Sequence, residues 1–291
     1  MYSLALFDSI EKMKKQRTYK NSRFEYHKKL YDYHLPWAGH IFFAYDLVCN
    51  LKPKMIVELG TYRGTSFFSF CQAVKDRHLS TKLFAIDSWE GEDHTGMYGN
   101  DILKEVKNIV NNYYRKINIK LLKTYFDTAV NKFKDNQIDI LHIDGLHTYE
   151  AVRHDYETWQ GKVSKNGIIL FHDINVQERG FGVYAFWKEL KKSKNTIEFH
   201  HSQGLGVIVR DTQMYHELKK MEKMFQKKYE NMSKKAKLIE SQNKESLVLY
   251  VKELENMLVQ SKNDLEKIQS AKAYKLWQKY NDLKKIVNKL T

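Results

Sequence analysis

Proline and cysteine are scarce in this chain of 291 residues, with two of each. Cys49 and Cys71 lie within apolar helical patterns, so neither a disulfide framework nor a zinc site is expected. No apolar run approaches the ~20 residues of a membrane span, and the first residues lack the basic start and long apolar core of a signal peptide. These absences predict a protein of a reducing, cytoplasmic compartment.

Positive charge is in excess and unevenly distributed. The formal net charge is +14, and residues 211–291 contain 18 lysines against 11 acidic residues, which is half of that excess. A basic surplus suits a nucleic acid or an anionic membrane surface as a partner. A lysine-rich composition without any such partner produces the same surplus, so charge alone leaves these alternatives open.

Apolar runs of strand length alternate with helical patterns in the middle of the chain. This order predicts a doubly wound α/β fold, a mostly parallel sheet with helices on both faces. We expect a helical cap at residues 1–50, the α/β domain at 51–210 and a helical tail at 211–291. The expected strands are Met55–Leu59, Leu83–Asp87, Ile119–Lys123, Ile138–Ile143 and Ile168–His172, followed by a hairpin of Ile197–His200 and Gly206–Arg210.

The tail contains neither proline nor glycine, and its apolar residues recur at alternating steps of four and three. This heptad pattern predicts a coiled coil, and a helix this polar needs a partner, either a second copy of the chain or another protein. A solvated lysine-rich helix is the alternative. We expect truncation near Arg210 to leave a folded domain. The heptad positions are Leu247, Val251, Leu254, Leu258, Leu265 and Ile268, then Leu276, Tyr280, Leu283, Val287 and Leu290.

The most informative segment joins the first expected strand to the first helix of the domain. The strand ends at Glu58, and Gly60 and Gly64 then lead into a helical pattern, giving E-x-G-x-x-x-G. Such a turn presents backbone N–H groups to a small ligand, and a Cβ would obstruct it. Tyr62 stands where a dinucleotide fingerprint has its second glycine.

Polar residues also end the later strands, where doubly wound sheets bind ligands. Asp87 ends the second strand and can accept hydrogen bonds from ribose hydroxyls or cap a helix. Asp144 ends the fourth, His147 follows three residues later, and His172-Asp173 ends the fifth. Carboxylates and imidazoles gathered there can hold a divalent ion, and His147 suits a general base. Alternatively, His172 only orients Asp173, or Asp173 is a turn residue.

The E-x-G-x-x-x-G turn resembles motif I of class I S-adenosyl-L-methionine (SAM) methyltransferases. The pattern I-D-G-x-H-x-Y-E, followed by G-I-I-L-F-H-D, resembles a branch of that family found beside glycosyltransferases in surface-polysaccharide pathways. The resemblance covers about residues 35–210. It implies a Rossmann-like fold with a seven-stranded sheet, and SAM as the cofactor. It places SAM against Glu58, Gly60, Thr61, Gly64, Ser66, Asp87 and Ser88.

Related metal-dependent O-methyltransferases hold Mg²⁺ at the fourth and fifth strand tips. The corresponding residues here are Asp144, His172 and Asp173, with Asp144 and His147 as the catalytic pair. His172 stands where the sugar enzymes carry an acid, so a softer divalent ion, or no metal, is the alternative. The loop at residues 89–99 is expected to act as a lid, unless it is an ordinary loop. Its expected acceptor contacts are Trp89, His94 and Tyr98.

The resemblance therefore implies in-line methyl transfer to a sugar or glycan hydroxyl in polysaccharide biosynthesis. It leaves room for a homo-oligomer or coiled-coil partner on residues 211–291, and for contact with the anionic inner membrane surface. A nucleic-acid methyltransferase is disfavoured, because prolines only at Pro36 and Pro53 exclude an N-P-P-Y-like motif. A non-catalytic scaffold acting through its tail is disfavoured by the presence of Asp144, His147 and Asp173.

Overall fold

The computed structural model describes residues 36–92, 96–97, 100–178 and 180–234. Toward the end of the chain it describes residues 255, 257–263, 265–266, 275–277 and 279–281. The chain divides into two compact units, Met1–Ala236 and Lys237–Thr291. Within the described part, no helix combines the length and the apolar character needed to cross a membrane.

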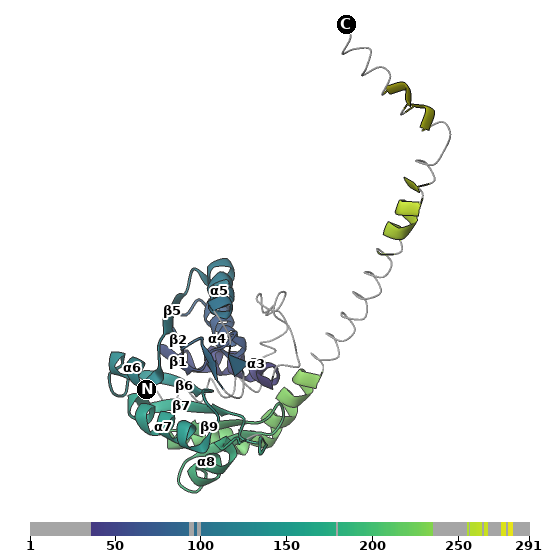
Figure 1. Ribbon diagram of the computed structural model, residues 1–291. Coiled ribbons are helices and arrows are strands. Elements are labelled where there is room, and N and C mark those ends of the chain that lie inside the picture. The colour runs from purple at the N-terminus through teal and green to yellow at the C-terminus, as the bar shows by residue number, and fades with distance from the viewer. Residues whose placement is uncertain are drawn as a thin grey trace. The chain divides into compact units, whose positions relative to one another are not determined.

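A seven-stranded sheet forms the centre of the first unit (Figure 1). Its order is β5-β2-β1-β6-β7-β9-β8, and β9 runs antiparallel to both of its neighbours. The predicted doubly wound, mostly parallel sheet with a closing hairpin is confirmed. The strands are β1 (Met55–Leu59), β2 (Lys82–Asp87), β5 (Asn118–Lys123), β6 (Ile138–Ile143), β7 (Val163–His172), β8 (Thr196–Phe199) and β9 (Leu205–Val209).

Helices cover both faces of this sheet (Figure 1). On one face lie the 3₁₀ turn η1 (Pro36–His40), α3 (Ile41–Leu51), α4 (Thr65–Asp76) and α5 (Asn100–Ile109), with π-helical residues Val110–Tyr114 after α5. On the other face lie α6 (Phe126–Ala129), α7 (Tyr149–Trp159) and α8 (Val183–Leu190).

Alternation along the strands assigns each side chain to one face. Ile56 of β1 belongs to the core under α3, α4 and α5, whereas Val57 belongs to the core under α6, α7 and α8. Glu58 follows the parity of Ile56, and in the register of β1 and β6 it lies opposite His142. The sequence pattern therefore directs two polar side chains into the core beneath α3 and α4.

The first unit ends at residue 236, beyond the expected boundary at residue 210. Met214 of α9 (Thr212–Lys220) and Phe225 and Tyr229 of the following helix are buried in the core with α3. Lys228 Nζ and Tyr229 Oη both donate hydrogen bonds to Asp46 Oδ2 of α3, at 2.7 and 2.9 Å. A cut at residue 210 removes Met214, Phe225 and Tyr229 from the core. Burial of a Met or Phe side chain stabilises a fold by about 1.5–3 kcal/mol, so we expect a chain cut there to be destabilised.

The second unit is helical wherever it is described. Its large apolar side chains are exposed: Met257, Leu258, Val259, Leu265, Leu276, Trp277 and Tyr280. Four of them, Leu258, Leu265, Leu276 and Tyr280, are heptad positions. The other heptad positions lie outside the described residues. The coiled coil therefore stays a prediction.

Candidate active site

The turn between β1 and α4 depends on glycine. Gly60 has φ +84°, and a Cβ there would lie 2.0 Å from the backbone oxygen of Asp144 at the tip of β6. Gly64 has φ +83° and precedes the first residue of α4. L side chains rarely adopt such φ values, and the close approach of β6 excludes even a methyl group. The predicted glycine turn is thus packed directly against the next strand tip.

Asp87, at the end of β2, accepts hydrogen bonds from this turn. Its Oδ2 accepts the backbone N–H groups of Thr61 and Tyr62 at 2.9 and 2.8 Å, and its Oδ1 accepts that of Trp89 at 2.6 Å. A carboxylate has about four acceptor positions, so it can still accept a further hydrogen bond. The geometry leaves the predicted ribose contact of Asp87 open.

A cavity of about 370 Å³ lies over the tips of β1, β2, β5 and β6. Carboxyl ends of strands are where ligands bind in doubly wound sheets. Gly60, Asp87, Ser88, Asp144 and His147 were predicted to be part of the site. The lining residues after β5 and on α7 were not predicted, because no motif in the sequence distinguishes them. The other lining residues are Tyr62, Gly91, Thr124, Tyr125, Phe126, Asp127, Gly145, Leu146, Ala151, His154 and Asp155.

Glu58 is completely buried and does not line this cavity. Its Oε2 lies 2.9 Å from His142 Nδ1, and Trp37 Nε1 donates to His142 Nε2 at 3.0 Å. Because an indole N–H can only donate, His142 carries its proton on Nδ1 and donates it to Glu58. Burial raises the pKa of Glu58, although the His142 hydrogen bond opposes this. Glu58 therefore ties β1 to β6 and, through His142, to η1.

Three further residues expected to hold SAM do not line the cavity either: Thr61, Gly64 and Ser66. The Thr61 and Ser66 side chains are buried. Thr61 contributes through its backbone N–H, which helps to hold Asp87, and Gly64 permits the entry into α4. Direct contacts of these residues and of Glu58 with SAM remain predictions.

Trp89 does not have the exposed position expected of a lid residue. Its side chain is 1% exposed, and its Nε1 donates to the backbone oxygen of Tyr62 at 3.0 Å. The indole is part of the packed core and cannot stack on an acceptor in this conformation. The following residues form a two-stranded antiparallel sheet of β3 (Gly91–Glu92) and β4 (Gly96–Met97). His94 and Tyr98 lie outside the described residues.

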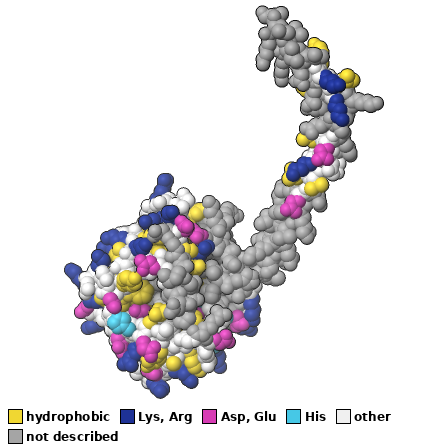
Figure 2. All heavy atoms as spheres, in the orientation of Figure 1, with side chains coloured by type: hydrophobic (Ala, Val, Ile, Leu, Met, Phe, Trp, Pro, Cys, Tyr) yellow, Lys and Arg dark blue, Asp and Glu magenta, His cyan; other side chains and the backbone are white. Residues whose placement is uncertain are grey.

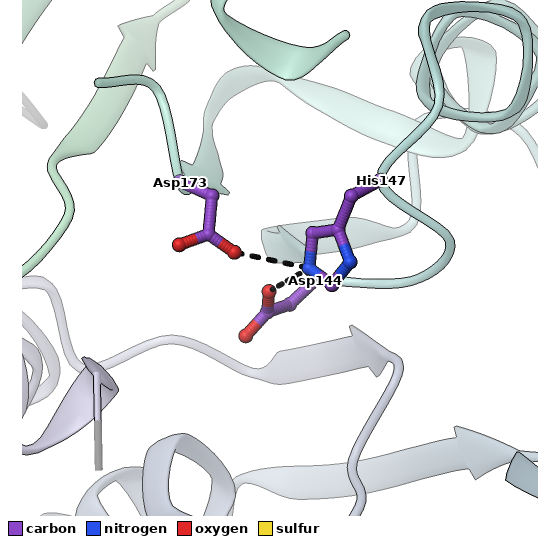
Figure 3. A group of neighbouring side chains, drawn as sticks. All are labelled: Asp144, His147 and Asp173. Atoms are coloured by element: carbon purple, nitrogen blue, oxygen red, sulfur yellow. Dashed lines mark ion pairs between the residues drawn. The ribbon is translucent and has the colours of Figure 1, made fainter. Parts of the chain in front are cut away.

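Asp144, His147 and Asp173 converge beside the cavity (Figure 3). Nε2 of His147 lies 3.0 Å from Oδ2 of Asp173 and 3.5 Å from Oδ1 of Asp144. Asp144 and Asp173 follow β6 and β7, and His147 lies in the loop before α7. Asp173 has φ +61°, a conformation that aspartate tolerates better than most residues. The predicted convergence at neighbouring strand tips is present.

The carboxylates determine the charge of this group. Burial lowers the pKa of His147, but hydrogen bonds and charge from Asp144 and Asp173 outweigh burial and raise it to about 9. Burial acts to raise the pKa of both carboxyls. The charge of His172 and hydrogen bonds from His147 outweigh this and keep both values below the usual range. Near neutral pH the group is an imidazolium between two carboxylates.

The expected role of His172 as a third metal ligand stays a prediction. Among the described residues, the group whose ligand atoms lie within 4.8 Å of one another contains His147 instead. His172 Nδ1 is 3.5 Å from Asp144 Oδ1 and 3.2 Å from Asp173 Oδ1, while its Nε2 donates to the oxygen of Ser202 at 3.2 Å. Its side chain is buried behind the two acids, on the sheet face of η1 and α3. Two carboxylates and an imidazole nitrogen fit a divalent ion.

The His147 ring is held by a segment that the sequence analysis did not single out. Phe181 stacks on it with ring centroids 4.5 Å apart and an interplanar angle of 21°. Gly182 N–H donates to the backbone oxygen of His147 at 2.7 Å, and a Cβ on Gly182 would lie 2.1 Å from Tyr149 N. The residues before α8 therefore fix both the ring plane and the backbone of His147.

Residues 57–174 match the family model described as a methyltransferase domain. Two uncharacterized proteins are similar in sequence. Protein y4gI of Sinorhizobium fredii is 41% identical over 178 residues, which is 61% of this chain and 19% of that protein. Protein R132 of Acanthamoeba polyphaga mimivirus is 32% identical over 121 residues, or 40% and 50% of the two chains. The chain thus spans about a fifth and a half of the lengths of these relatives.

A solved structure with this fold is that of a candidate caffeoyl-CoA O-methyltransferase from Staphylococcus aureus. It is 13% identical, covers 69% of this chain and 99% of its own, and gives a TM-score of 0.50. At this identity the likeness shows the fold alone. Residues 57–174 are thus similar to a methyltransferase domain, and this match covers less than half of the chain. The sheet order agrees with the Rossmann-like fold that the sequence resemblance implied.

Proposed function

We propose that this domain transfers the methyl group of SAM to a hydroxyl oxygen, with Asp144, His147 and Asp173 at the point of transfer. One observation carries the proposal. Asp144 and His147 line the same cavity as Gly60 and Asp87. A cofactor bound against the glycine turn would therefore reach the acid–histidine–acid group without leaving the cavity.

SAM has three parts, and the cavity offers a suitable surface for each. Asp87 would accept hydrogen bonds from the ribose hydroxyls. The turn at Gly60 would lie against the methionine part, because no side chain obstructs it there. The sulfonium methyl would then point toward Asp144 and His147. In this pose the acceptor enters from the Asp144 side, whose carboxylate is 18% exposed.

The reaction is an in-line displacement. The acceptor oxygen forms a bond to the methyl carbon as the carbon–sulfur bond breaks, and the sulfur keeps the electron pair as S-adenosylhomocysteine forms. The hydroxyl proton passes to Nε2 of His147. Alignment of the two reactants and removal of the proton are what the protein supplies. Because the pKa of His147 is about 9, the ring must first lose its own proton.

A divalent ion, if it takes part, would be held by Asp144, Asp173 and His147 Nε2. Bound there, it would lower the pKa of the acceptor hydroxyl and fix its position. The same nitrogen cannot hold an ion and accept a proton at once. The roles of base and ligand for His147 are therefore alternatives that experiment can separate.

We propose a sugar or glycan hydroxyl as the acceptor, on the resemblance of the strand-tip motifs to the polysaccharide-associated branch. The name of the Staphylococcus aureus protein also refers to oxygen methylation, although that likeness shows only the fold. Lysine and arginine side chains are interspersed with acidic ones over the face shown in Figure 2. That distribution does not favour a nucleic acid as substrate.

For residues 237–291 we propose pairing with a second copy of the chain. The heptad pattern and the exposed Leu258, Leu265, Leu276 and Tyr280 support it. Their lysines would also suit an anionic membrane surface. Analytical ultracentrifugation of the full chain and of a chain ending at residue 236 tests the pairing. Equal molecular masses of the two would contradict it.

The methyl-transfer proposal is tested by calorimetry and by product analysis. We expect S-adenosylhomocysteine to bind the purified full chain, and labelled SAM to transfer its methyl group to a glycan fraction. The assay is run with EDTA and with added Mg²⁺ or Mn²⁺. A well-folded protein that does not bind S-adenosylhomocysteine would favour the non-catalytic scaffold. Label transferred only to nucleic acid would contradict the acceptor.

A further inference from the structure

Asp155 of α7 is a buried acid in the cofactor cavity that the proposed chemistry does not use. Its side chain lines the cavity and is 7% exposed. Within the described part of the chain, no hydrogen bond or ion pair engages its carboxyl group. A ligand that fills the cavity would cover this carboxyl group, and a covered polar group without a partner is costly, so such a ligand must supply one.

The cavity beside Asp155 is lined by an aromatic ring and by small or apolar residues, as well as by His154 and Asp127. A Cβ built on Gly145 would lie 2.6 Å from Cε2 of Phe126 and 3.3 Å from Oδ2 of Asp155. Gly145 therefore leaves open a corner that the Phe126 ring and the Asp155 carboxyl border. Leu146 and Ala151 also line the cavity. A planar aromatic base suits such a corner better than the charged methionine end of SAM does.

We propose that Asp155 recognises the adenine ring of SAM, with its protonated carboxyl group donating to N1 and accepting from the N6 amino group. This inference rests on the proposed function, because it assumes that SAM occupies the cavity. Asp87 and the Asp144–His147 pair, which also line the cavity, would take the ribose and the methyl group. The remaining base then points to the corner at Phe126 and Asp155.

The electrostatics support the protonated form. Burial raises the pKa of Asp155 to about 7, although the charge of His154 lowers it and that of Asp127 raises it slightly. His154 and Asp127 are the charged groups that face it, and they pair with each other at 2.8 Å. A neutral carboxyl can donate and accept side by side, which matches the adenine edge, whereas a carboxylate can only accept.

The test is calorimetric titration of S-adenosylhomocysteine into the full chain at about pH 6 and about pH 8. If the protonated form binds, wild-type affinity falls about tenfold between these values, and about one proton is taken up per ligand at the higher pH. In Asp155→Asn the amide keeps the donor–acceptor pair without titrating. Its affinity should be independent of pH and its proton uptake absent. Asp155→Leu should bind at least about tenfold more weakly than wild type at about pH 6 and should show no such fall in affinity between the two pH values.

Glu157→Gln is the matched control, because it removes one negative charge from the exposed side of α7, where Glu157 pairs with Arg153. It should retain the wild-type pH dependence. A wild-type affinity that does not change or that rises with pH, or a folded Asp155→Leu variant that binds as wild type, would overturn the role of Asp155. No binding by wild type at either pH would count against SAM in this cavity, and thus against the proposed function.

Discussion

Two groups, each made of two aspartates and one histidine, border the same cavity but differ in charge. In the first, His147 bridges Asp144 and Asp173, and all three side chains are at most 18% exposed. In the second, His154 pairs with Asp127, and these two side chains are 59% and 68% exposed. Asp155 is buried, and none of the described residues forms a hydrogen bond or ion pair with its carboxyl group.

The pKa values of the acids in the two groups therefore shift in opposite directions. In the first group His147 holds a proton and both acids are charged, because the charge of the neighbouring His172 and hydrogen bonds from His147 favour the carboxylates. In the second group Asp155 lies apart from the histidine's hydrogen bond, and burial alone acts strongly on it. Residue composition does not determine charge; contact and burial do.

The strongest test of this difference replaces each histidine. His147→Ala should reduce methyl transfer by about a thousandfold, because it removes both the proton acceptor and the partner of two carboxylates. The affinity for S-adenosylhomocysteine should stay within about threefold. His154→Ala should change turnover by less than about threefold, since its ring is mostly exposed. Steady-state kinetics and calorimetry measure both. Equal loss of turnover and affinity in His147→Ala would indicate a structural role.

Removing the negative charge of one acid in the first group should destabilise the folded protein. Asp173→Asn keeps a residue that tolerates the left-handed backbone conformation, but it leaves the imidazolium with one carboxylate fewer. We expect the free energy of unfolding to fall by about 2–3 kcal/mol near pH 6, and the pKa of His147 to fall as well. Chemical denaturation and NMR titration of the ring measure these changes. An unchanged His147 pKa would contradict the pairing.

An aspartate-to-asparagine substitution in the second group should raise the free energy of unfolding instead of lowering it. A carboxyl with a raised pKa in the folded state destabilises the protein progressively as pH rises from about 4 to about 7, because the unfolded chain releases its proton first. Asp155→Asn removes this cost and should stabilise the ligand-free protein by about 2 kcal/mol near pH 8, and less near pH 5. Thermal unfolding at the two pH values measures it. A loss of stability near pH 8 would mean that the charged carboxyl has a partner.

The smallest expected effect is in the pH dependence of the reaction. His147 accepts a proton only in its neutral form, and its pKa is about 9. The value of kcat/KM without metal should therefore rise about tenfold per pH unit between about pH 7 and about pH 8. A divalent ion that competes with the proton on Nε2 would shift this rise to lower pH. A profile that is flat with and without metal would exclude His147 as the base.

Much of the site could be predicted because strand-tip positions follow from local pattern. In a chain where strands and helices alternate, the parallel strands all end at the same edge of the sheet. The positions of Asp87, Asp144 and Asp173 at strand ends were therefore enough to predict that they lie at one edge. The glycine turn could also be predicted from local sequence. Gly60 and Gly64 have positive φ values in the turn between β1 and α4, a conformation that glycine adopts readily.

Other features depend on which element packs where. Sequence patterns could not show that Trp89 turns inward to bond Tyr62, or that helices after residue 210 pack on α3. Nor could they show how His147 and His172 are held, although both rings lie within 3.5 Å of the two acids. Phe181 holds the first ring and Ser202 the second, and each is distant in sequence from the histidine that it contacts.

The sequence by itself determined the order of strands and helices, the glycine turn and the acids at the strand tips, because these depend on periodicity and on backbone conformation at single residues. Only the tertiary structure decided which side chains are buried, which carry a proton and where the first unit ends. Burial and charge are set by groups that approach from several elements, and the energy of a charge depends on those neighbours more than on its own residue type.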